Sequence, residues 1–199
     1  MKKFQAEGGI GSISSRLAVQ GPLLKDKASF IVSGRRTYID ALVKPFIKKG
    51  SQFYGSGYYF YDLNAKFNYK FSNKDRLYIS GYFGRDVFDF VNNQRQFDVN
   101  IPWGNSTLTA RWNHVFSNKL FLNTTVVYND YDFALGALQN NFNFALKSGI
   151  RDVNIKSDLD HYLTPEHQLK YGIQYTFHRF SPSVVSGQQD SVVFNPNNA

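Results

Sequence analysis

The sequence predicts an all-β fold in which about eight antiparallel strands run up and down and follow one another along the chain. Apolar side chains alternate with polar ones through most of its length. The alternating segments are roughly ten to fourteen residues long, whereas strands of soluble proteins usually have about five or six. Short turns alternate with long polar links, so the two ends of the sheet are expected to differ.

The clearest alternation lies in residues 58–71, YYFYDLNAKFNYKF. Apolar residues hold the odd positions: Tyr59, Tyr61, Leu63, Ala65, Phe67, Tyr69 and Phe71. The even positions from 62 onward are Asp62, Asn64, Lys66, Asn68 and Lys70. Because successive side chains of a strand point to opposite faces, we expect a strand with one apolar face and one polar face.

The same period of two recurs in seven further expected strands, whose apolar residues on one face fall within 13–19, 30–38, 77–83, 108–116, 120–128, 153–163 and 169–177. Placing Phe71 opposite Leu77 turns the apolar sides of both strands of that hairpin to one surface. Placing Phe116 opposite Leu120 does the same in another hairpin. We therefore expect one sheet with a continuous apolar face.

The connections indicate which solvent that face meets. Short turns are expected near 24–27, 72–76, 117–119 and 164–168, and long links at 40–57, 88–103 and 129–147. Short turns on one side and long loops on the other are typical of transmembrane β-barrels, as are long tilted strands with aromatic residues toward their ends. The sequence therefore predicts a barrel segment with lipid outside and water inside. The alternative is a soluble sandwich with an aromatic-rich core.

Composition excludes several classes of protein. The chain has no cysteine, so a disulfide framework and a thiolate metal site are both excluded. Its net charge of +8 comes from scattered Lys and Arg residues, which favours a solvated surface over a nucleic-acid partner. No apolar run is long enough for a membrane helix. Met1-Lys2-Lys3 is followed by no apolar stretch, so we expect no export signal in this chain.

No arrangement of residues points to catalysis, and we expect no enzyme, no cofactor, no metal site and no catalytic residue. The histidines, His114, His161, His167 and His178, lack the spacing of zinc ligands. Gly8-Gly9-Ile10-Gly11 precedes no helical pattern, and no Gly-x-Ser-x-Gly elbow occurs. Asp158 and Asp160 share a face with Lys156 and Lys170, so we expect these carboxylates to pair with cations.

Two stretches of sequence, 7–23 (EGGIGSISSRLAVQGPL) and 25–40 (KDKASFIVSGRRTYID), resemble TonB-dependent outer-membrane receptors. The closest likeness is to the large SusC-like receptors with an N-terminal carboxypeptidase-regulatory-like domain. Residues 158–172 also resemble a barrel hairpin of these receptors. The likeness is distinctive at 7–40 and elsewhere has the general character of a β-barrel.

The resemblance implies a barrel of about twenty-two strands around a plug. Such a receptor imports scarce nutrients of the siderophore, cobalamin or glycan class and is powered by a periplasmic TonB-type energiser. On this view residues 1–199 are a single barrel segment that covers the first strands. Residues 1–12 then form a plug-to-barrel junction and 181–199 a loop or tail. The implied partners are the outer-membrane lipid bilayer, the rest of the barrel and plug, and the energiser.

This chain departs from the family pattern, because it has no TonB-contacting segment and no plug, so we expect a fragment that does not transport alone. One alternative is a complete eight-stranded outer-membrane barrel with a structural or adhesion role. Another is a soluble all-β binding module. Residues that contact substrate are unknown from the sequence, and the long links are candidates by position only.

Overall fold

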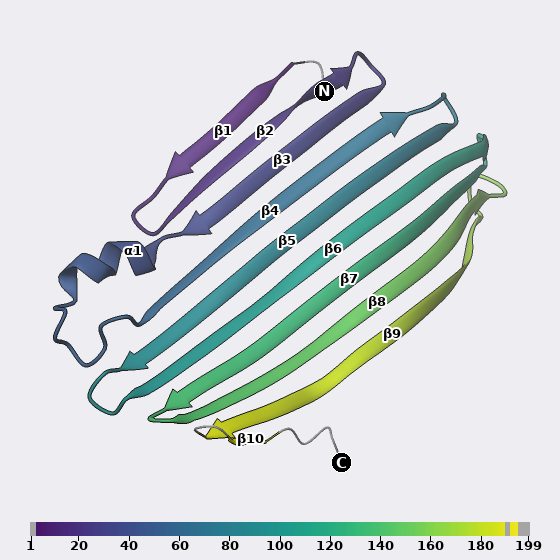
Figure 1. The fold of residues 1–199 in the computed structure, drawn as a ribbon. Coiled ribbons are helices and arrows are strands. Elements are labelled where there is room, and N and C mark those ends of the chain that lie inside the picture. The colour runs from purple at the N-terminus through teal and green to yellow at the C-terminus, as the bar shows by residue number, and fades with distance from the viewer. Residues whose placement is uncertain (1–2, 190–191, 195–199) are drawn as a thin grey trace.

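The computed structural model describes residues 3–189 and 192–194, which form one antiparallel sheet of ten strands in chain order. Figure 1 shows the strands side by side from β1 to β10. Their bounds are β1 (Gln5–Ile10), β2 (Ser14–Leu24), β3 (Ala28–Thr37), β4 (Gly57–Lys70), β5 (Asp75–Asn92), β6 (Phe97–Ser117), β7 (Leu120–Gln139), β8 (Phe142–Tyr162), β9 (Gln168–Gln189) and β10 (Val192–Phe194). The all-β, up-and-down prediction is confirmed.

All eight expected strands are present, as β2 to β9, and two more lie at the edges. Residues 5–10, within the expected junction, form β1 and pair with β2, Gln5 lying opposite Gln20. The expected tail at 181–199 is largely strand as well, because β9 continues to Gln189 and 192–194 pair with it as β10. Residues 190–191 and 195–199 of that segment lie outside the described residues.

The predictions of two of the three long loops are wrong. Residues 88–103 belong to β5 and β6, which are joined by a tight turn at 93–96, and 129–147 belong to β7 and β8, joined at 140–141. Gln96 and Asn140 adopt positive φ angles of 46° and 52° in these turns. The third long loop is confirmed, since 38–56 carry helix α1 (Ile39–Val43) and the 3-10 turn η1 (Lys44–Phe46).

The loops were mispredicted because the apolar residues change face along these strands. In β5 the apolar positions are odd at Leu77, Ile79 and Phe83, and even at Phe88 and Phe90. In β7 they are even at Val126 and Tyr128 and odd at Tyr131, Phe133 and Leu135. A period of two that changes phase reads as the end of a strand, although backbone pairing continues through it.

The expected registers are confirmed in one hairpin and shifted in the other. In β6 and β7, His114 lies opposite Leu122 as expected, but a bulge at Phe116 places Ser117 opposite Leu120. In β4 and β5, Tyr69 lies opposite Leu77, two residues from the expected Phe71. Phe71 is in the turn instead, where its N–H donates to the carbonyl of Asp75 at 3.0 Å. A shift of two residues leaves each side chain on its expected face.

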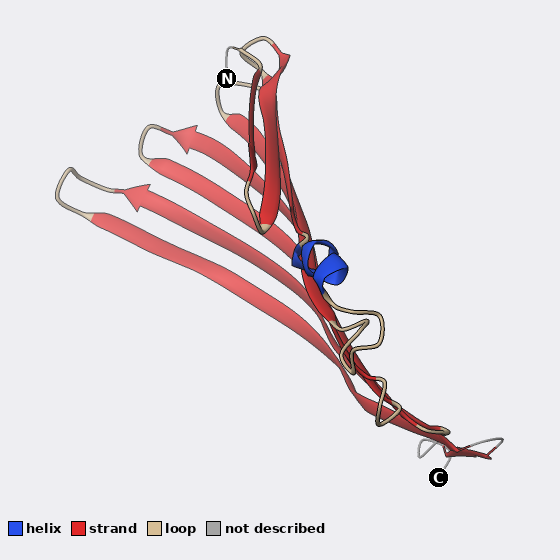
Figure 2. Cartoon of the chain, turned by 90° about the vertical axis from the view of Figure 1, so that its left-hand side faces the viewer, coloured by secondary structure: helices blue, strands red, loops and turns tan. Residues whose placement is uncertain are grey.

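The sheet is a single curved layer, as the view in Figure 2 shows. Among the described residues, the buried apolar side chains are Ala28 and Val87, and no large side chain is fully buried. Apolar residues in the middle of strands stay exposed: Leu108 by 54%, Ile155 by 47% and Ile173 by 76%. The described part of the chain therefore has no hydrophobic core of its own.

The hairpin between β5 and β6 can be tested with cysteines, because the chain has none of its own. Asp89 lies directly opposite Asn100, so the double variant D89C/N100C is expected to form a disulfide under mild oxidation of the full chain. In the control variant D89C/I101C the second cysteine points to the opposite face of the sheet, so both thiols of this variant should stay free. Thiol titration measures both variants. Equal oxidation of the two pairs would contradict the paired strands at 88–103.

Candidate functional site on the two faces of the sheet

Two rows of neighbouring side chains define the faces of the sheet. One row crosses six strands in register as Lys66, Ser80, Thr109, Val127, Asn154 and Thr176. The adjacent row, on the other face, consists of Ala65, Gly81, Leu108, Tyr128, Val153 and Phe177. We call the first the polar face and the second the apolar face.

Ion pairs cross the polar face between neighbouring positions. Lys156 Nζ lies 2.9 Å from Asp158 Oδ2, and Lys170 Nζ lies 3.1 Å from Asp160 Oδ1. The pairing of Asp158 and Asp160 with cations is therefore confirmed. At the other edge of the sheet, Arg16 Nη2 lies 2.8 Å from Glu7 Oε1 on β1. These charges neutralise one another in pairs.

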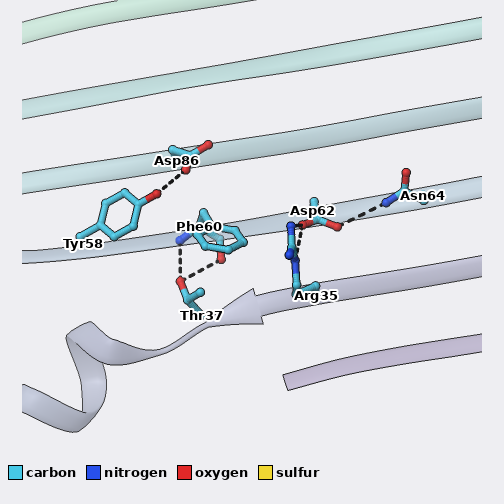
Figure 3. Close-up of polar contacts among 7 residues, drawn as sticks. All are labelled: Arg35, Thr37, Tyr58, Phe60, Asp62, Asn64 and Asp86. Carbon is cyan, nitrogen blue, oxygen red and sulfur yellow. Dashed lines mark hydrogen bonds and ion pairs between the residues drawn. The ribbon is translucent and has the colours of Figure 1, made fainter. Parts of the chain in front are cut away.

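An ion pair with a sheltered carboxylate joins β3 to β4. Arg35 Nη2 lies 2.7 Å from Asp62 Oδ2, and the Asp62 side chain is only 10% exposed. Asp62 also accepts a hydrogen bond from the Asn64 side chain at 3.3 Å, as Figure 3 shows. The Arg35 guanidinium lies 4.8 Å from the ring centre of Phe60, where the cation meets the negative face of the ring. Arg35 and Asp62 thus fix the β3–β4 pairing near its end.

Thr37 completes that end of the pairing. Its hydroxyl accepts a hydrogen bond from the Phe60 N–H at 2.8 Å and lies 3.3 Å from the Phe60 carbonyl, to which it donates (Figure 3). Thr37 is only 5% exposed. At the point where the chain leaves β3 for α1, the Thr37 hydroxyl replaces a backbone partner for the N–H and the carbonyl of Phe60. It satisfies backbone groups that the departing strand no longer reaches.

Four cations on β4, β5 and β6 have no such pairs. Lys66, Lys70, Arg76 and Arg111 lie on the polar face near the short-turn end of the sheet. A hollow of about 400 Å³ opens between three of these strands, lined by Lys66, Tyr78, Ser80, Thr109, Arg111 and Asn113. We call Lys66, Lys70, Arg76 and Arg111 the cationic patch.

Toward the α1 end of the sheet, the two faces exchange character. The apolar face becomes charged there, with Arg85 Nη1 3.1 Å from Asp132 Oδ2 and Arg151 Nε 2.9 Å from Asp130 Oδ2. The polar face becomes aromatic, with Tyr58, Phe60, Phe88, Phe90, Trp103 and Phe133, which we call the aromatic end. Charged and apolar side chains therefore change places between the two faces along β5 to β8.

Tyr58 gives the aromatic end a polar anchor beyond that height. Its hydroxyl donates to Asp86 Oδ1 at 2.7 Å, and its ring stacks on Trp103 at 6.4 Å between ring centres. The hydrogen bond to Asp86, followed by burial, raises the pKa of Tyr58 to about 12. Tyr58 therefore stays protonated at neutral pH and holds Asp86 in place (Figure 3).

At the opposite end of the sheet, Asp75 connects the turn between β4 and β5 to residues of β6. It contacts His114 Nδ1 at 2.6 Å and accepts hydrogen bonds from Ser72 Oγ at 2.9 Å and Trp112 Nε1 at 3.2 Å. Through these contacts the Asp75 carboxylate holds the turn against β6.

Among the described residues, no three His, Cys, Asp or Glu side chains lie together as possible metal ligands. His114 and His178 each contact a single carboxylate, Asp75 at 2.6 Å and Asp152 at 2.7 Å. In the part of the chain that the structure describes, no helix is long and apolar enough to span a membrane.

Comparison with known proteins relates the chain by its fold. The sequence matches no family model, and no curated protein matches it. The structure is similar to the ferric yersiniabactin uptake receptor FyuA from Yersinia pestis, with a TM-score of 0.59 at 14% sequence identity. The alignment covers 96% of this chain and 35% of the receptor, so the chain spans about a third of that receptor's length.

A second solved structure, the CymD monoaromatic hydrocarbon channel, aligns over 92% of this chain and 76% of its own. Its TM-score of 0.29 at 12% identity is too low to support an argument. The likeness to FyuA concerns the fold alone. The chain has the fold of part of an up-and-down outer-membrane β-barrel.

The Arg35–Asp62 pair is expected to contribute more to stability than the exposed Arg16–Glu7 pair. A double-mutant cycle with R35A and D62A should give a coupling energy of about 1–3 kcal/mol, because Asp62 is sheltered from water. The matched cycle with R16A and E7A should give about 0.5 kcal/mol or less, because both side chains are at least 70% exposed. Urea unfolding of the full chain in detergent micelles measures both. Equal coupling in the two cycles would contradict the sheltered position of Asp62.

Proposed function

We propose that this chain forms part of the wall of an outer-membrane transport barrel, with its apolar face toward lipid and its polar face toward the lumen. The observation that carries the proposal is the single-layer sheet whose apolar face is covered by nothing among the described residues. Burying one large apolar side chain is worth about 1.5–3 kcal/mol. If about a dozen such residues of the apolar face stayed in water, the stabilisation lost would exceed the roughly 5–15 kcal/mol of net stability that folded proteins have.

The height of the apolar face agrees with a bilayer. On β6 it runs from Leu108 to Phe116, which is nine residues, or eight steps that cover about 26 Å along a strand. A tilt of 35–45° reduces this to about 20 Å, close to the apolar band of about 25 Å on outer-membrane barrels. The charged pairs Arg85–Asp132 and Arg151–Asp130 then lie outside the band, where they are solvated.

We further propose that the parent protein is a nutrient-import receptor of the TonB-dependent type. The resemblance of residues 7–40 and the likeness of the sheet to one third of FyuA, itself a ferric yersiniabactin uptake receptor, both support this. The sheet also has two separate edges, β1 and β10, which require further strands to close a barrel. A plug and a periplasmic energiser would belong to the parent, and the chain alone would not transport.

A small closed barrel with a structural or adhesion role is the second candidate. Ten strands fall within the range of known outer-membrane barrels, which favours it. The ten strands would then have to bring β1 and β10 together, which the described structure does not do. A soluble binding module is disfavoured, because it requires a core that the described residues do not form.

Two neighbouring valines test the orientation of the sheet. Val126 lies on the apolar face of β7 and Val127 on the polar face, and Val126 is opposite Ala110, within the apolar stretch of β6 from Leu108 to Phe116. V126R is expected to destabilise the chain in phospholipid vesicles by about 2–4 kcal/mol, because it places a cation in the lipid band. V127R places the same cation in the aqueous lumen and should lower the free energy of unfolding by about 1 kcal/mol or less. Urea titration of vesicle-inserted protein measures both. A larger effect of V127R would reverse the assignment of the faces.

The parent receptor is tested by the mass of the native product. An antibody against residues 129–147 is expected to detect, in the outer-membrane fraction, a species several times larger than 22.8 kDa. A membrane species near 22.8 kDa whose mobility shifts on boiling would favour the small barrel instead. Recovery in the soluble fraction would overturn the lipid-facing assignment.

A further inference from the structure

The cationic patch is a cluster of unpaired positive charges, whereas the other cations named on the polar face are paired with carboxylates. Lys66 and Lys70 lie on β4, Arg76 on β5 and Arg111 on β6, all on the polar face. Elsewhere on this face, Arg16, Arg35, Lys156 and Lys170 each have a carboxylate within 3.1 Å. None of the four patch residues forms an ion pair with any described residue.

The contacts that the patch does make are neutral. Lys66 Nζ lies 5.8 Å from the ring centre of Tyr78, and Arg76 Nη1 donates to the Tyr78 hydroxyl at 3.3 Å. Arg111 Nε donates to the Thr125 hydroxyl at 3.2 Å. Lys70 and Arg76 are direct cross-strand neighbours. Like charges placed directly opposite one another destabilise a sheet, so a compensating anion would relieve the repulsion.

The space beside the patch has the size and the donors of a small-molecule site. The hollow of about 400 Å³ falls in the range of ligand pockets. Besides Lys66 and Arg111, its lining offers the Asn113 amide and the hydroxyls of Ser80 and Thr109. These groups donate hydrogen bonds, and no carboxylate lines the hollow. Charge-assisted hydrogen bonds from ammonium and guanidinium groups favour carboxylate and phosphate oxygens.

We propose that the cationic patch binds a small anion that carries carboxylate or phosphate oxygens. The inference rests on the proposed function, since it is the lumen of a barrel that would bring solutes to this face. Lys66 and Arg111 contact the anion from the two sides of the hollow, and Lys70 and Arg76 raise the local positive potential. The patch lies near the short-turn end, so the site is separate from the aromatic end and from the 38–56 loop.

Calorimetric titration of the full chain in non-ionic detergent with citrate, and in parallel with inorganic phosphate, tests the site. We expect saturable binding that weakens with added salt. The variant K66Q/R111Q should lower the affinity for citrate by about tenfold or more, because two charge-assisted hydrogen bonds are lost. The matched variant K156Q/K170Q removes the same charge from the same face but spares the hollow. Its affinity should fall by less than about threefold, since it loses only distant screened charge.

The charge-preserving variant K66R/R111K separates binding from folding, and it should keep the affinity within about threefold, because both cations remain. Absence of citrate and phosphate binding, or equal losses in K66Q/R111Q and K156Q/K170Q, would overturn the site. Flotation of the same preparation with phospholipid vesicles reports membrane insertion separately. Protein that inserts but binds no anion contradicts the site alone, and protein that binds but does not insert contradicts the barrel wall alone.

Discussion

Backbone hydrogen bonds between neighbouring strands hold the described part of this chain together. Because the described residues form one layer, no packing between layers holds the strands together. The ladder is nearly continuous from β4 to β9 and is interrupted mainly by bulges at Phe116 and near Ser148. In lipid an unpaired backbone group costs several kcal/mol, so this ladder is the condition for crossing a bilayer.

The single layer also explains how the polar face is built. Side chains there meet only neighbours on the same or adjacent strands, so each charge is balanced locally or remains unbalanced. Arg35 and Asp62 show the first case, with the carboxylate sheltered between strands and an amide beside it. Lys70 and Arg76 show the second case, as direct neighbours of like charge.

The exchange of the two faces toward α1 separates a region in which one face is apolar from a region in which the same face carries ion pairs. The long strands β5 to β8 carry backbone pairing well past the exchange. The aromatic end therefore stands on a rigid extension of the sheet, where the sequence had suggested loops. Tyr58, bound to Asp86 and stacked on Trp103, shows that these rings are held in a fixed arrangement.

The fold class, the positions of the short turns, the two faces of the central strands and the pairing of Asp158 and Asp160 with lysines could all be predicted from the sequence. Each follows from local spacing, because a period of two fixes which side chains share a face. The sequence did not locate the aromatic end or β1, since the alternation changes phase or is weak there.

Alternation already places Lys66, Arg76 and Arg111 on the polar face, but only the pairing of the strands shows that they lie close together and without a carboxylate partner. The observed register sets Lys70 directly opposite Arg76, whereas the expected register would have set it opposite Tyr78 on the same face. Register depends on turn geometry and bulges, such as those at Phe71 and Phe116, which alternation alone does not fix.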